Sequence, residues 1–420
     1  MTAPPRACPF ASRRTLLAAA AGLAGAITLH RARAETVPAP PADRVPFRAY
    51  HQAGILTPQQ SHLYFAAFDV TTPERAELID LLRRWTDAAA RLAAGETAAP
   101  LGQDPSQPGT DSGEAIGLGP ARLTLTFGFG PGLFEKNGAD RFGLARLRPE
   151  PLAELPRFNG DQLIAERSGG DLSVQACADD PQIAFHAVRQ LARLAYGAAR
   201  IRWVQAGFLP RTRPGETPRN LMGFKDGTNN PAAAEAASVV WAGDEAPPWL
   251  QGGSYLVARR IRIALEHWDR TEIDFQEQTM GRQKYSGAPL GAKAEFDPLP
   301  LAAMDAEGNP VIAENAHVRL GAPASHGGAR ILRRGSAYDD GVNMTAERWP
   351  PWRQGLEFDA GLFFLAYQRD PRRGFIRIFE TMAKLDALNQ FTTHTGSALF
   401  ACPRGIAAGE FIGQDLFSAA

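Results

Sequence analysis

The sequence has few cysteines, no long apolar runs and no net charge, and each shortage excludes a class of protein. Only three cysteines occur in 420 residues, and none stands at zinc-site spacing from a histidine. This excludes a disulfide-stapled scaffold and a zinc domain. Basic and acidic residues balance at 45 each. No segment beyond the N-terminus is apolar enough to predict a membrane-spanning helix.

The charge balance changes once the N-terminus is set aside. Residues 1–34 contain arginines but no acidic residue, and without them 40 basic residues stand against 45 acidic ones. A slightly acidic chain is a poor ligand for nucleic acid or for an anionic membrane surface. We therefore expect neither as the main partner.

The N-terminus predicts a twin-arginine export signal. Residues 12–17 read SRRTLL, a mildly apolar core follows over 18–29, and Ala32-Arg33-Ala34 forms a cleavage site. A membrane anchor is the alternative, but this core is shorter than the ~20 residues that span a bilayer. We expect a periplasmic protein cleaved after Ala34. The twin-arginine pathway carries folded proteins, often with their cofactor already inserted, which hints at a prosthetic group.

Periodicity along the mature chain predicts a protein with both strands and helices. A Pro-rich extended strap is expected over 35–60 and a long loop over 95–120. Alternating apolar residues predict strands at 61–70, 123–129, 172–178, 202–208, 253–265 and 362–367. Amphipathic spacing predicts helices at 74–94, 181–198 and 266–275.

Two local matches suggest that the chain repeats one plan. In 178–185 and again in 368–375, a strand ends in Asp-Pro, and we expect a helix to start at the Pro, with a Phe four residues after it. Chance convergence on good helix-start chemistry is the alternative. We interpret the match as duplication. We therefore expect an α+β fold of two ferredoxin-like units, each a mostly antiparallel sheet with helices on one face, over 61–222 and 223–420.

The remaining cysteines are expected to be thiols. Cys8 leaves with the signal, while Cys177 and Cys402 lie in different halves of the chain. An oxidising compartment permits a disulfide between them. Two separate buried thiols are the interpretation that we prefer.

The segment 223–231 reads GFKDGTNNP and places Asp226 between two glycines. Glycine allows positive φ and the close approach of another group. An ordinary solvated loop is the alternative for such a motif taken alone. The segment lies at the expected junction of the two units, where ligand clefts are common.

Two further sites are candidates for chemistry. His317 is flanked by apolar residues and has no second histidine at helical spacing, so it predicts a lone ligand such as the proximal histidine of haem. Arg333 and Arg334 end an apolar strand. They suit either surface charges or the stabilisation of an anion that forms as a peroxide bond breaks.

These motifs together resemble those of the dye-decolourising (DyP-type) haem peroxidases, and especially their exported deferrochelatase branch. The resemblance covers nearly all of the mature chain. Its most specific parts are 223–231, WDRT at 268–271, GR at 281–282, SGAPLG at 286–291, AHVRL at 316–320 and LRRG at 332–335.

The resemblance implies a fold of the dimeric α+β barrel type, one haem b per chain and roles for particular residues. His317 would be the axial iron ligand, Asp226 the distal acid and base, and Arg333 the distal arginine. Gly227, Thr228 and Asn229 would line the haem. A carboxylate is expected to accept the other ring proton of His317, and Asp359 is our candidate.

The chain departs from the family after 317–320. Asn and Arg often follow there and hold the haem propionates, whereas this chain has Ala322 and Ala324. The replacement anchor would be Arg319, Arg330 or Arg334.

Three functions share such a site. The first is a peroxidase that uses hydrogen peroxide to oxidise dyes and phenols. The second is a deferrochelatase that removes iron from haem and leaves the porphyrin intact, with iron-uptake partner proteins. The third is a non-enzymatic haem carrier. A homodimer is expected by analogy alone. Because a carboxylate acts as a base in more acidic solution than imidazole, peroxidase activity should peak well below pH 7.

Overall fold

The computed structural model describes residues 43–213, 215–346 and 354–419. The predicted signal 1–34, its cleavage site and the first part of the strap lie outside these residues. The described residues belong to one compact unit. Residues 44–60 of the strap form neither helix nor strand. No helix in the described part of the chain is long and apolar enough to cross a membrane.

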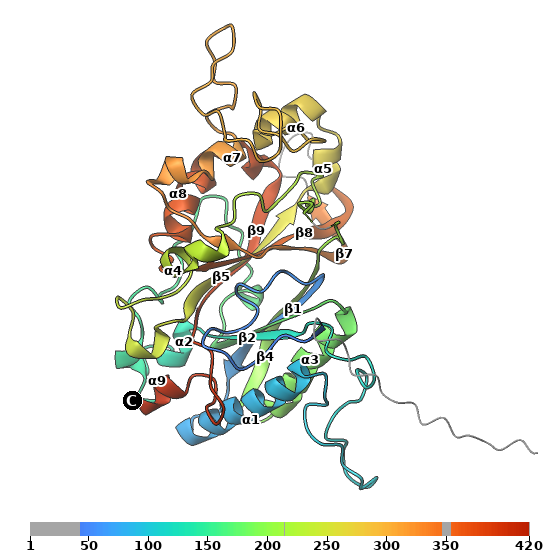
Figure 1. Ribbon diagram of the computed structural model, residues 1–420, viewed down its shortest axis with the longest axis vertical. Coiled ribbons are helices and arrows are strands. Elements are labelled where there is room, and N and C mark those ends of the chain that lie inside the picture. Colours follow the sequence, from blue (N-terminus) through green and yellow to red (C-terminus); the bar gives the residue numbers. More distant parts are fainter. Residues whose placement is uncertain (1–42, 214, 347–353, 420) are drawn as a thin grey trace, which may run out of the picture. The chain divides into compact units, whose positions relative to one another are not determined.

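The chain alternates strands and helices along its length (Figure 1). The strands are β1 (His62–Val70), β2 (Thr124–Phe129), β3 (Leu172–Ala178), β4 (Ala199–Phe208), β5 (Ser254–Ile263), β6 (Leu332–Arg333), β7 (Ser336–Ala346), β8 (Gln354–Gln368) and β9 (Thr392–Cys402). The α-helices are α1 (Arg75–Ala93), α2 (Pro131–Phe134), α3 (Pro181–Leu194), α4 (Ala236–Val239), α5 (Leu265–Asp269), α6 (Ile273–Met280), α7 (His317–Leu320), α8 (Phe375–Leu385) and α9 (Gln414–Ser418).

The strands form a sheet that closes on itself. Its order is β5-β9-β2-β3-β1-β4-β7-β8-β6, and β5 also pairs with β8. The two junctions between the halves are single bridges, Phe129 with Ala401 and Phe208 with Ala337. Two sheets that meet at such narrow seams enclose an interior, which makes the fold a barrel.

Each half of the barrel has the ferredoxin-like strand order. The first half runs β4-β1-β3-β2 and the second runs β9-β5-β8-β7, so corresponding strands occupy corresponding places. All named pairs in both halves are antiparallel. This confirms the predicted α+β class and the ferredoxin-like units. The exact boundary at 222–223 stays a prediction.

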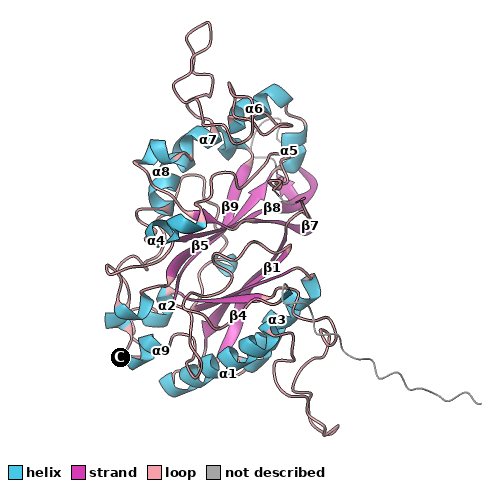
Figure 2. Cartoon of the chain, viewed as in Figure 1, coloured by secondary structure: helices cyan, strands magenta, loops and turns pink. Residues whose placement is uncertain are grey.

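Helices cover the outer faces of the two sheets (Figure 2). Helix α1 buries Leu78, Leu82 and Trp85, spaced three or four residues apart, and so presents one apolar stripe. Helix α3 begins where Asp180 accepts hydrogen bonds from the backbone of Gln182 and Ile183, at 2.8 and 3.1 Å. These helices lie against the first half, while α5 to α8 lie over the second.

One predicted helix start was wrong. The second Asp-Pro match was expected to open a helix at Pro371, but residues 371–374 form a turn and α8 begins at Phe375. Gly374 precedes the helix with an unusual backbone conformation, and a Cβ there would lie 2.6 Å from the side chain of Gln368. The turn at 371–374 therefore stands where, in the first match, α3 begins at Pro181.

The barrel interior is a mainly aromatic core. Phe65 stacks on Trp203 and meets Phe363 edge-on, with ring centroids 5.1 and 5.4 Å apart. Cys177 and Cys402 are both buried and both unpaired, as expected.

Candidate active site

Asp226 sits in a tight loop that lies over the second half of the barrel. The loop turns back on itself, with the Gly223 amide bonded to the Asn220 carbonyl at 3.0 Å. Gly223 and Gly227 have φ values of 85° and 117°, which L-residues with side chains rarely adopt. The Asp226 amide donates to the Pro218 carbonyl at 2.9 Å. The local sequence thus fixes the backbone of Asp226 from both sides.

Phe224 anchors this loop to the protein. It is buried beside Trp268, and Trp268 in turn meets Phe391 edge-on at 4.8 Å between centroids. The Trp268 indole donates to the Met222 carbonyl at 3.0 Å. Trp268 of the WDRT motif therefore packs against the loop and holds it in place.

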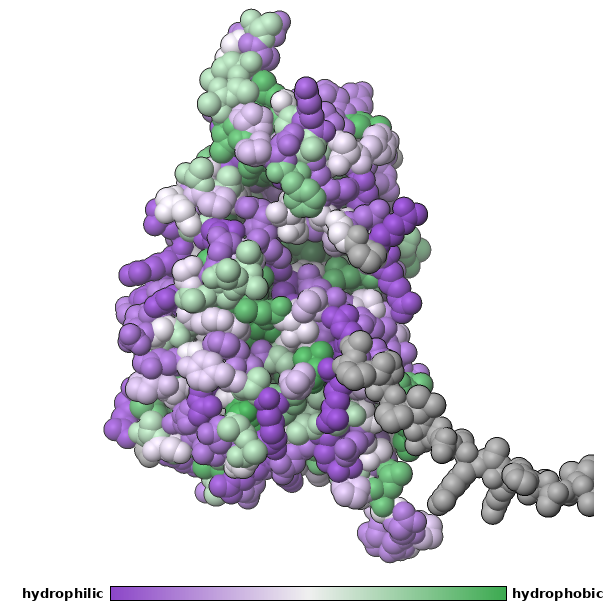
Figure 3. All heavy atoms as spheres, viewed as in Figure 1, coloured by the Kyte–Doolittle hydropathy of each residue, from purple (hydrophilic) through white to green (hydrophobic). Residues whose placement is uncertain are grey.

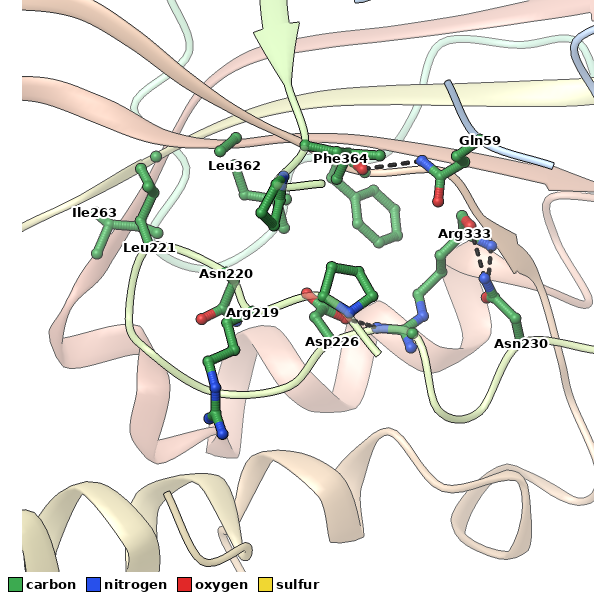
Figure 4. A pocket seen from close by; sticks show the side chains of 17 residues that line it. Gln59, Arg219, Asn220, Leu221, Asp226, Asn230, Ile263, Arg333, Leu362 and Phe364 are labelled. Carbon is green, nitrogen blue, oxygen red and sulfur yellow. Dashed lines mark hydrogen bonds and ion pairs between the residues drawn. The ribbon is translucent and has the colours of Figure 1, made fainter. Parts of the chain in front are cut away.

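Arg333 is paired directly with Asp226 (Figure 4). Its Nη1 atom lies 3.0 Å from Oδ1 of Asp226, and the two side chains are 30% and 33% exposed. Asn230 holds the backbone of Arg333 at two points: its Oδ1 accepts from the Arg333 amide at 3.0 Å, and its Nδ2 donates to the Arg333 carbonyl at 2.8 Å. The same loop thus supplies Asp226 and positions its partner.

A cavity of about 650 Å³ opens at this pair. Its apolar walls come from the outer face of the sheet and include Ile263, Leu362 and Phe364. Figure 3 shows a hollow with hydrophobic residues inside it on the face that carries this sheet. Apolar walls with a few convergent polar groups are typical of cofactor and substrate sites.

His317 begins the short helix α7 and is fixed by a buried carboxylate. Its Nδ1 atom lies 2.7 Å from Oδ2 of Asp386, whose side chain is only 4% exposed. Oδ1 of Asp386 accepts from the Leu388 amide at 2.9 Å. Nε2 of His317 has no hydrogen-bond partner within the described residues, and the side chain is 31% exposed.

The prediction that Asp359 accepts the Nδ1 proton of His317 was wrong. Asp359 lies on β8, where Oδ1 accepts from Arg260 at 2.8 Å and Oδ2 from Asn343 at 3.1 Å. Arg260 is buried on β5, so Asp359 neutralises a buried guanidinium instead of orienting His317. Asp386 was missed because it is distant in sequence. The available signal was an Asp that ends one helix and caps the next short one.

The three polar groups influence one another electrostatically. Burial opposes protonation of His317, but the Asp386 carboxylate outweighs it and raises the pKa of the imidazole. Asp226 also raises this pKa, whereas Arg333 lowers it. Asp226 and Arg333 therefore act electrostatically on the predicted iron ligand.

The donor set fits haem. A structural or catalytic zinc takes three or four protein ligands, whereas haem iron takes one proximal histidine. His317 offers a single free Nε2, and the carboxylate on Nδ1 fixes the tautomer that leaves Nε2 a ligand. His317 would therefore hold the iron, and Asp226 and Arg333 would stand ready for a polar molecule that reacts there.

The predicted lining is only partly found at the cavity of Asp226. Gly227 lines it, whereas Thr228 and Asn229 do not, and Asn229 is exposed. Their contact with haem stays a prediction. Asn230 does line the cavity and was not singled out in the sequence. Its position four residues after Asp226 in a Gly-rich turn was the only signal.

The three arginines considered as propionate anchors differ in what they contact. Arg334 does not suit the role of propionate anchor, because it is buried and donates to the carbonyls of Ile55 and Thr57, on the strap. Arg319 donates to the carbonyls of Ile312 and Leu301. Arg330 pairs with Glu235 but keeps a buried Nε without a hydrogen-bond partner in the described structure. Arg330 therefore remains the candidate.

Comparison with known families gives matches to both halves of the chain. The N-terminal family model of the Dyp-type peroxidases matches residues 52–209, and the C-terminal model matches residues 217–407. Together they span nearly all of the described residues.

Individual proteins agree with the family models. The chain is 39% identical over 393 residues to a dye-decolorizing peroxidase of Thermobifida fusca, which covers 89% of this chain and 85% of that protein. It is 37% identical over 426 residues to a deferrochelatase of Escherichia coli strain K12, which covers 96% of each. A solved structure of DtpA from Streptomyces lividans, described as an oxyferrous complex, has a TM-score of 0.79 and 40% identity, and covers 89% of this chain and 97% of that one.

Proposed function

Because this chain belongs to the Dyp-type peroxidase family, as its motifs predicted, we propose that it is an exported haem b peroxidase that uses hydrogen peroxide to oxidise dyes and phenols. It is an enzyme, and its cofactor is haem. The observation that carries the proposal is the Asp226–Arg333 pair at 3.0 Å in a cavity on the same half as His317. A protein that only carried haem would need no such pair.

The proposed reaction balances as one hydrogen peroxide and two phenol molecules giving two waters and two phenoxyl radicals. When bound, haem would supply the redox-active iron through which electrons pass from the phenol to peroxide. Asp226 takes a proton from one peroxide oxygen and returns it to the other, which leaves as water. Arg333 lies beside Asp226 and stabilises the negative charge that develops on the departing oxygen.

The loop geometry suits proton transfer by Asp226. One oxygen of its carboxylate accepts a hydrogen bond from Arg333, and its backbone amide donates to the Pro218 carbonyl. These contacts hold the side chain in one orientation. On the other side, the carboxylate of Asp386 increases the electron donation of His317 to whatever its Nε2 binds. The oriented Asp226 would thus serve proton transfer at the peroxide, and the Asp386–His317 contact would serve electron donation to the iron.

A direct experiment separates peroxidase from iron release. The purified chain is loaded with haem and incubated with 2,6-dimethoxyphenol, with and without hydrogen peroxide. We expect peroxide-dependent oxidation of the phenol and no fluorescence of metal-free porphyrin. Porphyrin fluorescence without phenol oxidation would overturn the proposal.

Deferrochelatase activity is the second candidate, and a specific observation favours it. The relatives named deferrochelatase align over 96% of this chain, and the alignment includes its N-terminal region. The same haem site would then hold haem as substrate, releasing iron to iron-uptake partner proteins while the porphyrin stays intact. The fluorescence arm of the experiment above tests this candidate.

The location follows from the N-terminus. Residues 1–34 carry the twin-arginine pattern, so the mature enzyme would act in the periplasm, as a homodimer by analogy with related proteins. N-terminal sequencing of the exported protein should begin at Glu35. A start at Met1 in a periplasmic fraction would contradict cleavage after Ala34.

A further inference from the structure

A second cavity adjoins the cavity of Asp226. It is the larger of the two, about 1,140 Å³ against about 650 Å³, including the parts open to solvent. The two cavities have four lining residues in common: Gln59, Leu209, Pro210 and Pro218. These four residues form a rim, and we call the outer cavity the vestibule.

The rim is fixed to both sides of the opening. Leu209 donates its amide to the Ser61 carbonyl at 2.8 Å, which ties the segment after β4 to the residue before β1. Gln59 donates its side-chain amide to the Gly335 carbonyl at 3.1 Å, two residues after Arg333 (Figure 4). A stable rim of this kind divides one continuous opening into an inner and an outer compartment.

The rim also lies next to the reacting groups. Pro218 accepts the 2.9 Å hydrogen bond from the Asp226 amide, so one rim residue is directly bonded to the residue proposed to move the proton. A molecule in the vestibule is therefore one residue away from the inner cavity.

The walls of the vestibule indicate what it would bind. Leu209, Pro210 and Pro218 give apolar surfaces, which suit the face of an aromatic ring. Asp179 is already matched by Arg122, with Nη1 and Oδ2 3.0 Å apart, so it contributes little free negative charge.

Arg211 is the unmatched charge of the vestibule. It is exposed, and its guanidinium makes no ion pair or hydrogen bond with any residue that the structure describes. Thr212 beside it is also exposed and offers a hydroxyl. An exposed guanidinium next to apolar walls is suited to an anionic substituent on an aromatic ring.

We propose that the vestibule is the binding site of the reductant, and that it takes hydroxylated aromatic molecules with an anionic substituent held by Arg211. The inference rests on the proposed peroxidase function and adds the substrate class and the anchoring residue. The inner cavity is left to peroxide, while the aromatic ring remains outside the rim.

Binding is measured first, without peroxide, so that turnover plays no part. Isothermal titration of the haem-loaded chain uses 4-hydroxybenzenesulfonate as the anionic probe and phenol as the neutral one. Arg211→Gln should weaken the sulfonate about fivefold, the scale of one exposed ion pair, and leave phenol unchanged. Arg213→Gln is the matched control, since Arg213 is exposed on the same segment but does not line the vestibule.

A second variant tests whether the probes bind in the vestibule, whereas Arg211→Gln tests the charge of the guanidinium. Thr212→Trp should fill the vestibule and weaken both probes, with an unchanged Soret band showing that the haem site is intact. Equal effects of Arg211→Gln and Arg213→Gln, or unaltered binding in Thr212→Trp, would overturn the proposal. If the wild type binds the sulfonate through Arg211 but oxidises no phenol, the peroxidase function fails while the binding site stands.

Discussion

The Nδ1 atom of His317 lies 2.7 Å from Oδ2 of Asp386, and this contact joins residues 69 positions apart in the sequence. Asp386 stands between α8 and the short helix at 387–390, where its other oxygen accepts from the Leu388 amide. One carboxylate thus caps a helix and orients the predicted iron ligand. The His317 ring is held by the fold before any haem arrives.

Replacing Asp386 by Asn should weaken haem binding. The amide cannot supply the negative charge that fixes the His317 tautomer and strengthens its donor atom, and losses of 10- to 100-fold in affinity are usual for such partners. Titration of the haem-free protein with haem, followed at the Soret band, measures the change. Asp359→Asn is the control and should keep wild-type affinity, because Asp359 contacts Arg260 and Asn343. The reverse order of effects would restore Asp359 to the role first predicted for it.

Asn230→Ala should slow the reaction with peroxide. The variant removes the two hydrogen bonds from Asn230 to the Arg333 backbone and leaves only the pairing of β6 with β8, so Arg333 is held less firmly beside Asp226. We expect about a tenfold lower rate constant for peroxide, because one positioned donor contributes ~1.4 kcal/mol or more. The KM for the phenol should not change. Stopped-flow mixing with peroxide gives the rate constant, and the affinity for cyanide gives a second readout that involves no turnover.

The exposed-loop variant Asn309→Ala serves as the control for Asn230, since its amide contacts only Asp305 within its own turn. A wild-type peroxide rate in Asn230→Ala would show that Arg333 holds its position without the clamp.

Glu114→Gln should destabilise the first half in a pH-dependent way. Burial opposes ionisation of Glu114, but hydrogen bonds from Ser112 and the backbone and the neighbouring His186 outweigh it and hold the pKa at about 2, below the ordinary 4.5. Because the folded-state pKa is lowered, the stabilisation is fully present above pH 4.5. It is lost as the pH falls from 4.5 toward 2.

Urea unfolding of the wild type and of Glu114→Gln at several pH values measures this effect. The variant should be less stable by about 1–3 kcal/mol at pH 7, as expected for hydrogen bonds to a half-buried charged group, and the difference should shrink below pH 4.5. Glu135→Gln, in a looser and more exposed pair with Arg148, should show almost no difference. A difference that is constant with pH would show that the charge of Glu114 is not what stabilises this region.

The sequence predicted the strands with regular apolar alternation and missed those without it. β1, β2 and β3 were expected within a residue or two of their observed ends. β9 was not predicted because its residues include Gly396, Ser397 and the buried His394, which mask the alternation. β7 was missed because Asp339 and Asp340 precede a glycine at an irregular register and look like a turn. β9 is held mainly by pairing with β5, which is distant in sequence, whereas β7 is held mainly by pairing with the next strand, β8.

The candidate site shows a similar division. Asp226 and Arg333 were predicted to share a site because both lie in short motifs whose residue types indicate their chemistry. In the structure their side chains are 3.0 Å apart. Asp386 and Asn230 act through contacts that depend on where α8 ends and where β6 pairs, neither of which leaves a local pattern. The residues proposed to perform the chemistry were predicted from the sequence, whereas the residues that position them were found only in the fold.

The most direct test of the proposed function is the peroxide-dependent oxidation of 2,6-dimethoxyphenol by the haem-loaded wild type and by Asp226→Asn at equal haem content. Removing a positioned acid and base costs ~10²- to 10⁴-fold in rate. We therefore expect kcat to fall by at least a hundredfold in Asp226→Asn, with an unchanged Soret band. A variant that oxidises the phenol as fast as the wild type would contradict the role of Asp226 in proton transfer.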